Sequence, residues 1–223
     1  MTADHVKRLS SDCKATVAIG DVSRGGLTRG ANQACEHDLG LHEKYIPCGI
    51  VEEDSAQRRI TFGSSFKTSD FIVDVLEAWW AALDETAQGT MARLQLKMDN
   101  GPESNGMRTQ LLHRMVQFAG HIGKPIDLLY YPPYHSKDNP IERCWGILEL
   151  HWHGTKLVDV QTMLAWAKSR TWKGIHPIVE LSRKVYQKGM ALNKKAMQAI
   201  ERRLERHPAL PKWDILIRPA SAR

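Results

Sequence analysis

The middle of the chain alternates between helix and strand patterns, and this alternation constrains the fold more than any other feature. Apolar residues recur at the i, i+3, i+4 spacing of amphipathic helices in 68–83, 108–119 and 139–152. Short apolar runs at 93–98 and 126–131 lie between these segments and read as strands. Such alternation predicts a sheet with helices packed on its faces.

Strand patterns precede this region, and helical patterns follow it. The early strands are predicted at 15–20, 45–51 and 59–62, with a weaker one at 31–37. The later helices are predicted at 159–169, 179–187 and 193–206, before an extended tail. Three meandering strands followed by alternating helices and strands predict an α/β fold with a mixed central sheet.

The 223 residues fit one large domain or a domain with an appendage. We expect an N-terminal segment at 1–13, a main core at 14–154, and a helical, basic C-terminal extension at 155–223 that packs on the core. The sequence has no run of eighteen apolar residues and its amino end has no apolar signal segment, which predicts a cytoplasmic protein.

The four cysteines are scattered and predict reduced thiols rather than disulfides. Cys35, His37 and His42 lie close enough in sequence to form a metal clip, but no second matched pair follows them. Structural roles are therefore the favoured interpretation.

Three acids stand where strands end or a helix begins. Asp21 follows the strand at 15–20, Asp99 follows the strand at 93–98, and Glu142 lies in the first turn of the helix after Asn139. Each acid also has a plain structural explanation. Asp21 and Asp99 head turn-forming sequences, and Glu142 occupies the position of a capping-box carboxylate.

Other acids compete for the same role, because Asp38 could replace Asp21, and Asp127 or Asp138 could join the group. Carboxylates that converge at strand ends repel one another unless divalent cations neutralise them. Oxygen ligands favour Mg²⁺ or Mn²⁺ over zinc, and two such ions can promote phosphodiester displacement. The residues alone therefore predict a metal site without choosing its reaction.

Three motifs resemble the DDE transposases of bacterial insertion sequences. The string YYPPYHSKDNPIERCWGILE is similar to their third-acid motif, KMDNGPE to their second-acid strand, and IGDVSRGG to their first. Further matches such as TSDFIVDVLEAWW and LPKWDILIRP are most similar to the Rhodopirellula-type transposase family. The resemblance extends from about Lys14 to Pro219.

This resemblance implies a ribonuclease-H-like fold, with a mixed five-stranded sheet flanked by helices and an additional helical C-terminal region. It also implies that Asp21, Asp99 and Glu142 bind two Mg²⁺ or Mn²⁺ ions. DNA at element ends and at the target would be the substrate, and a homodimer or higher oligomer would pair the two ends in the nucleoid. Full-length members usually carry an N-terminal DNA-binding region, so a non-catalytic remnant is an alternative, and a nuclease without strand transfer is another.

Basic residues beside these acids are candidates for DNA phosphate binding. Arg24 and Arg29 follow Asp21, while Lys137 and Arg143 flank Glu142. His135 could also contact phosphate. A solvated surface is the alternative for each. The net charge of +6 agrees with a polyanionic partner but does not by itself indicate one.

Overall fold

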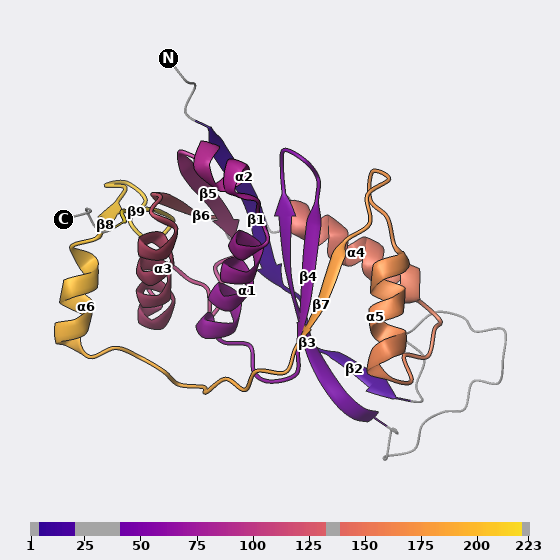
Figure 1. The fold of residues 1–223 in the computed structure, drawn as a ribbon. Helices are drawn as coiled ribbons and strands as arrows, with labels where there is room; N and C mark the ends of the chain where they lie inside the picture. Colours follow the sequence, from indigo (N-terminus) through magenta and orange to yellow (C-terminus); the bar gives the residue numbers. More distant parts are fainter. Residues whose placement is uncertain (1–4, 21–40, 133–138, 220–223) are drawn as a thin grey trace.

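The computed structural model describes residues 5–20, 41–132 and 139–219. In this part of the chain nine strands form one sheet, flanked by helices (Figure 1). Their order along the sheet is β7 (Ile178–Ser182), β4 (Arg58–Gly63), β3 (Leu41–Glu52), β1 (Val6–Cys13), β5 (Arg93–Met98), β6 (Ile126–Tyr130), β9 (Asp214–Ile217) and β8 (Leu204–Arg206). A further strand, β2 (Val17–Gly20), pairs with β3.

Strand polarity divides the sheet into an antiparallel and a parallel part. β1, β3 and β4 form an antiparallel meander, whereas β5 and β6 run parallel to β1 and to each other. The central order β4-β3-β1-β5-β6 with this polarity is that of the ribonuclease-H-like sheet expected from the sequence. The predicted fold class, a mixed sheet flanked by helices, is therefore confirmed.

The two faces of the sheet bury two separate apolar cores. One core lies under α1 (Ser69–Ala81), α3 (Thr109–Ile122) and α6 (Lys194–Glu201), and the other under α4 (Pro140–Trp152) and α5 (Val160–Ser169). Neighbouring residues of one strand point to opposite faces, so in β3 Ile50 joins the first core and Val51 the second. A short helix, α2 (Glu85–Thr90), follows α1.

The N-terminal segment at 1–13 was predicted to lie outside the core, but most of it forms part of the central sheet. Within it, β1 is a central strand that pairs with β3 on one side and β5 on the other. Its sequence, VKRLSSDC, is too polar to give an apolar strand pattern. Ser10 and Ser11 are nevertheless buried.

The C-terminal extension is less helical than predicted and contributes strands to the sheet. The helix predicted at 179–187 overlaps β7, which pairs in parallel with β4. The helix predicted at 193–206 ends as α6 at Glu201, and β8 follows it. The extended tail contains β9, which pairs with the edge of β6. Helical spacing failed here because pairing with an existing strand edge overrides local preference.

The remaining structural predictions have mixed outcomes. The weak strand predicted at 31–37 lies outside the described residues, as do Cys35 and His37. Cys13, Cys48 and Cys144 are buried free thiols. Within the described ranges, no helix is both long and apolar enough to cross a membrane.

Candidate metal centre

Strand register places two acids side by side on neighbouring strands. β1 and β5 run parallel, and their pairing continues to Ser11 opposite Met98. Asp12 follows Ser11 in β1, and Asp99 follows Met98 directly after the end of β5. Because parallel neighbours at the same register point to the same face, both carboxylates lie at the carboxyl ends of their strands on one side of the sheet.

The third acid reaches the site because α4 packs closely on the sheet. Gly49 of β3 lies opposite Asp12, and a Cβ atom at Gly49 would come within 2.6 Å of Ile141 Cδ1 and 2.7 Å of the Trp145 ring. Contacts that short do not occur, so the helix can approach this closely only where the strand has no side chain. The first turn of α4 then brings Glu142 beside Asp12.

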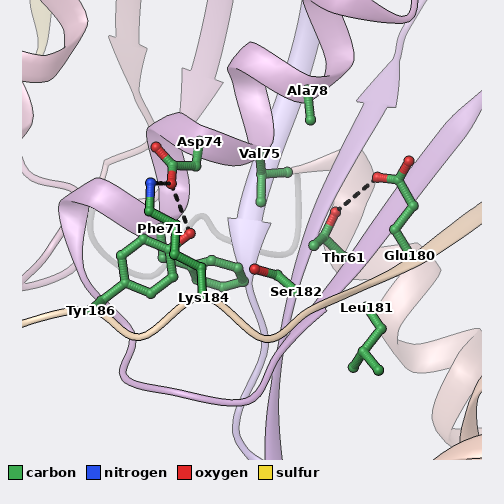
Figure 2. Close-up of a pocket in the computed structure, with 10 residues that line it drawn as sticks. All are labelled: Thr61, Phe71, Asp74, Val75, Ala78, Glu180, Leu181, Ser182, Lys184 and Tyr186. Carbon is green, nitrogen blue, oxygen red and sulfur yellow. Dashed lines mark hydrogen bonds and ion pairs between the residues drawn. The ribbon is translucent and has the colours of Figure 1, made fainter.

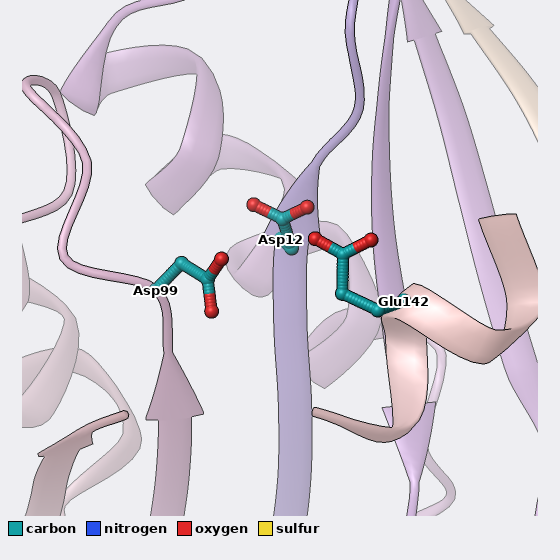
Figure 3. Close-up of side chains that lie close together, drawn as sticks. All are labelled: Asp12, Asp99 and Glu142. Carbon is teal, nitrogen blue, oxygen red and sulfur yellow. The ribbon is translucent and has the colours of Figure 1, made fainter. Parts of the chain in front are cut away.

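Asp12, Asp99 and Glu142, called here the triad, converge on one point (Figure 3). Each offers a carboxylate oxygen, and these oxygens lie within 4.8 Å of one another. All three residues are partly exposed, so a cation and a substrate can reach them from solvent. The three side chains come from β1, the end of β5 and the start of α4.

The surroundings of the triad favour the protonated form of two of its members. Burial raises the pKa of Asp12, and the Asp99 carboxylate raises it further. Burial also raises the pKa of Glu142, as do Asp12 and Asp99. Lys67 opposes both shifts with its positive charge. An added positive charge at the site would therefore stabilise the charged forms of Asp12 and Glu142.

Buried polar side chains donate hydrogen bonds to two of the three acids. The Trp145 indole Nε1–H donates to Asp12 Oδ2 at 3.2 Å, and the Asn139 amide Nδ2 donates to Asp99 Oδ1 at 3.3 Å. The Ser104 hydroxyl donates to the Asp99 carbonyl oxygen at 2.9 Å and accepts from the Gly101 N–H at 3.2 Å. The last pair shapes the turn that follows β5. Trp145 thus lies in the core and also contacts the site.

The triad shares two acids with the group predicted from the sequence. Asp99 and Glu142 are brought together, while Asp21 lies outside the described residues, as do the competing acids Asp38 and Asp138. Asp127 pairs with Arg93 at 3.2 Å and is absent from the triad. Asp12 is not among the acids predicted from the sequence, because no apolar strand pattern precedes it. The signal that could have indicated it is the position of Asp12 shortly before the apolar run ATVAIG, near the end of the polar strand β1.

Most of the predicted DNA-binding residues lie outside the part of the chain that the structure describes. Arg24, Arg29, His135 and Lys137 lie outside the described residues, and Arg143 is exposed on α4 next to Glu142.

Two lysines that the sequence analysis did not single out act on the triad. Lys67 lines a small cavity together with Asp12 and Asp99, and its Nζ lies 3.4 Å from the Cys13 carbonyl oxygen. The charge of Lys14 opposes the rise in the pKa of Glu142, and Lys14 pairs with Glu149 at 3.2 Å. Both lysines belong to the electrostatic surroundings of the three acids.

A larger cavity, of about 460 Å³, lies between α1 and the segment after β7 (Figure 2). It contains Asp74, whose carboxylate accepts from Lys184 at 2.5 Å and from the Tyr186 hydroxyl at 2.8 Å. On the other wall Glu180 pairs with Arg59 and lies 3.5 Å from the Thr61 hydroxyl. Asp74 and Glu180 are thus each paired with a basic side chain within the protein.

The donor set of the triad fits a hard divalent cation. Three carboxylates supply only oxygen ligands, which Mg²⁺ and Mn²⁺ prefer, and there is no thiolate or imidazole among them to favour zinc. Burial first, and then the neighbouring carboxylates, raise the pKa of Asp12 and of Glu142, and a bound cation would offset both effects by stabilising the charged carboxylates.

The family model described as the Rhodopirellula transposase DDE domain matches residues 1–219. A comparison with curated proteins gave no match. One similar solved chain comes from the cryo-EM structure of the simian T-cell lymphotropic virus intasome in complex with PP2A regulatory subunit B56 gamma. That likeness has a TM-score of 0.40 and 16% identity, and it covers 66% of this chain and 39% of that one.

The family match includes β1, β5 and α4, and therefore all three acids of the triad. It extends over nearly the whole of the 223 residues. The chain therefore belongs to the Rhodopirellula transposase DDE domain family.

Proposed function

We propose that this chain is a transposase catalytic domain that cleaves DNA at insertion-sequence ends and joins the ends to target DNA. The observation that carries the proposal is the convergence of three carboxylate oxygens within 4.8 Å, in a chain of a DDE transposase family. Asp12, Asp99 and Glu142 would hold two Mg²⁺ or Mn²⁺ ions per active site. When bound, such ions activate the attacking oxygen and stabilise the leaving oxygen of a phosphodiester displacement.

The protein's own residues would bind and orient the reacting DNA. The position of Lys67 beside Asp12 and Asp99 suits it to pair with a phosphate close to the scissile bond. Arg143 projects from α4 next to Glu142 and would contact the flanking backbone. The same role is proposed for Arg24, Arg29, His135 and Lys137, which the sequence places near the site.

Asp12 takes the role that the sequence analysis gave to Asp21. The support for Asp12 is the register of β1 with β5, which sets it beside Asp99. The proposal extends to a homodimer or higher oligomer on DNA, because two element ends must be paired. It also places the protein's action on nucleoid DNA in the cytoplasm.

An assay with labelled DNA carrying the element's own ends tests the function. With Mg²⁺, the wild-type chain should nick these ends and join them to a target duplex. Asp12→Asn, Asp99→Asn and Glu142→Gln should each lower both rates by roughly 10³-fold, because each removes a cation ligand worth several kcal/mol in the transition state. Asp127→Asn is the matched control, since Asp127 pairs with Arg93 outside the triad, and it should leave both rates unchanged.

The outcomes separate the competing functions. Nicking without joining would indicate a nuclease, and DNA binding without either reaction would indicate a non-catalytic remnant. Asp21→Asn decides between the two candidates for the first acid. Loss of activity in Asp21→Asn together with full activity in Asp12→Asn would return the role to Asp21.

A further inference from the structure

The start of α4 is capped in an unusual way. Asn139 occupies the N-cap position with an extended backbone, yet its side chain makes no capping hydrogen bond. The N-cap side chains Thr68 and Asn193 of α1 and α6, in contrast, each accept a backbone N–H of their own helix. In α4 the Ile141 N–H donates instead to the Ser10 hydroxyl of β1, at 3.1 Å. A residue 131 positions away in sequence therefore caps this helix.

The side chain of Asn139 is used for a different purpose. Its Oδ1 accepts a hydrogen bond from the Ser10 hydroxyl, and its Nδ2 donates to Asp99 Oδ1 at 3.3 Å. The opposite amide orientation would set an oxygen against the Asp99 carboxylate, so these contacts fix which way the amide points. Ser10 and Asn139 both have 0% exposure. Neither side chain is accessible to bulk solvent, so the loss of one partner would leave the other with an unmet hydrogen bond.

The bridge connects the three elements that carry the acids. Ser10 and Asp12 are two residues apart in β1 and point to the same face, toward α4. The Ser10 hydroxyl holds the first turn of α4, from which Glu142 projects. Asn139 then connects that turn to Asp99, at the end of β5. One buried chain of hydrogen bonds thus sets the positions of Asp99 and Glu142 relative to β1.

We infer that Ser10 and Asn139 are positioning residues, which hold the triad at the spacing needed to share divalent cations. The inference rests on the proposed cation-binding role of the triad and adds the residues that fix its geometry. Groups that orient metal ligands through hydrogen bonds typically change metal affinity by about 10- to 100-fold when they are removed. Neither residue touches the substrate in this assignment, since both act through Asp99 and α4.

A calorimetric titration of the full chain with Mn²⁺ tests the inference without DNA. In Asn139→Ser the first turn of α4 keeps its cap from Ser10, so the variant should fold, with a thermal unfolding midpoint lowered by a few degrees because buried hydrogen bonds are lost. It removes the donor to Asp99, so Mn²⁺ should bind about 10- to 100-fold more weakly. Ser10→Ala should weaken Mn²⁺ binding to a similar extent. The double variant should bind Mn²⁺ as tightly as the single variant of lower affinity, because both changes break the same chain of contacts.

Asn193→Ser is the matched control. It makes the same substitution at the N-cap of α6, whose side chain accepts from the Ala196 N–H, and it should leave Mn²⁺ affinity unchanged. In the DNA assay, raising the Mn²⁺ concentration should restore the activity of Asn139→Ser, which a purely structural role would not allow.

Wild-type Mn²⁺ affinity in a folded Asn139→Ser variant would overturn the inference. If that variant does not fold, the same result in Ser10→Ala would overturn it, since Ser10→Ala leaves Asn139 in place. A wild-type chain that binds no Mn²⁺ would instead refute the proposed function, and the inference would fail with it.

Discussion

At the scale of single residues, the triad places three like charges close together in a partly buried site. Burial and the neighbouring carboxylates raise the pKa of Glu142, which means that its charged form is disfavoured in the folded protein. Lys67 and Lys14 offset only part of this effect. In the absence of a cation the folded state therefore carries electrostatic strain at this point, which is common where side chains are arranged for function.

Removing one of these charges should stabilise the metal-free protein. Glu142→Gln should raise the free energy of unfolding at neutral pH by on the order of 1 kcal/mol, because it relieves repulsion with Asp12 and Asp99. It should also reduce the additional stability that Mn²⁺ gives the wild type through binding to the folded state. Urea unfolding with and without Mn²⁺ measures both effects.

Glu85→Gln provides the comparison, since Glu85 is exposed on α2 and its loss should change stability by less than about 0.5 kcal/mol. A metal-free Glu142→Gln variant less stable than the wild type would show that the carboxylate contributes net favourable contacts.

At the scale of elements, a segment called here the strap, residues 183–193, connects β7 to α6 and runs past the N-terminal ends of α1 and α3 (Figure 1). Asp74 of α1 holds it by accepting from Lys184 at 2.5 Å and from the Tyr186 hydroxyl at 2.8 Å. Arg114 of α3 donates to the same carboxylate at 2.8 Å. One acid therefore joins two helices and the strap.

Asp74→Asn should loosen the strap and lower the free energy of unfolding by roughly 2 kcal/mol at neutral pH, because charged donors lose their charged acceptor. Burial acts to raise the pKa of Asp74, but hydrogen bonds from Lys184, Arg114 and Tyr186 outweigh it and hold the pKa below its usual 3.8. A lowered pKa in the folded state stabilises the protein above the unfolded value. This contribution disappears as the pH falls through the folded pKa.

The stability difference between wild type and Asp74→Asn should therefore be constant near neutral pH and shrink below about pH 3.8. Urea unfolding across a pH series measures it. Asp54→Asn serves as the control, because the Asp54 side chain is 45% exposed and lies 3.7 Å from Arg8 Nη1. A difference that grows in acid would contradict the role assigned to Asp74.

At the scale of the whole molecule, the C-terminal extension completes the sheet. β9 covers the edge of β6, and Ile215 and Ile217 belong to the same apolar core as Leu96 and Leu128. β7 likewise extends the opposite end of the sheet beyond β4. Because the cores are continuous across these strands, the described parts of the core and the extension should unfold together.

Ile217→Ala should lower the free energy of unfolding by about 2–5 kcal/mol, since Ile217 has 0% exposure and its loss leaves a cavity between β6 and β8. Calorimetry should show one transition shifted to lower temperature. Leu210→Ala, at a residue that is 49% exposed, should barely move it. Two separate transitions would mean that the extension unfolds as an independent unit.

How far the sequence predicted this molecule differs between elements. α1 followed from its apolar stripe, and Thr68 caps it by accepting from the Phe71 N–H. β5 was predicted at its observed bounds, because a short apolar run flanked by a turn has few other interpretations. β1 was missed, since its buried serines are stabilised by tertiary contacts that no local pattern records. For the same reason, Ser10 and Asn139 could not be recognised as partners.

The sequence by itself determined the class of fold, the family, and two of the three acids, because apolar periodicity and the motifs around Asp99 and Glu142 are local properties. Only the tertiary structure brought Asp12 to them, through the register of β1 with β5 and the close packing of α4 at Gly49. The physical reason is that a shared cation site depends on distances across strands. Those distances are fixed by strand pairing and packing between residues far apart in the chain.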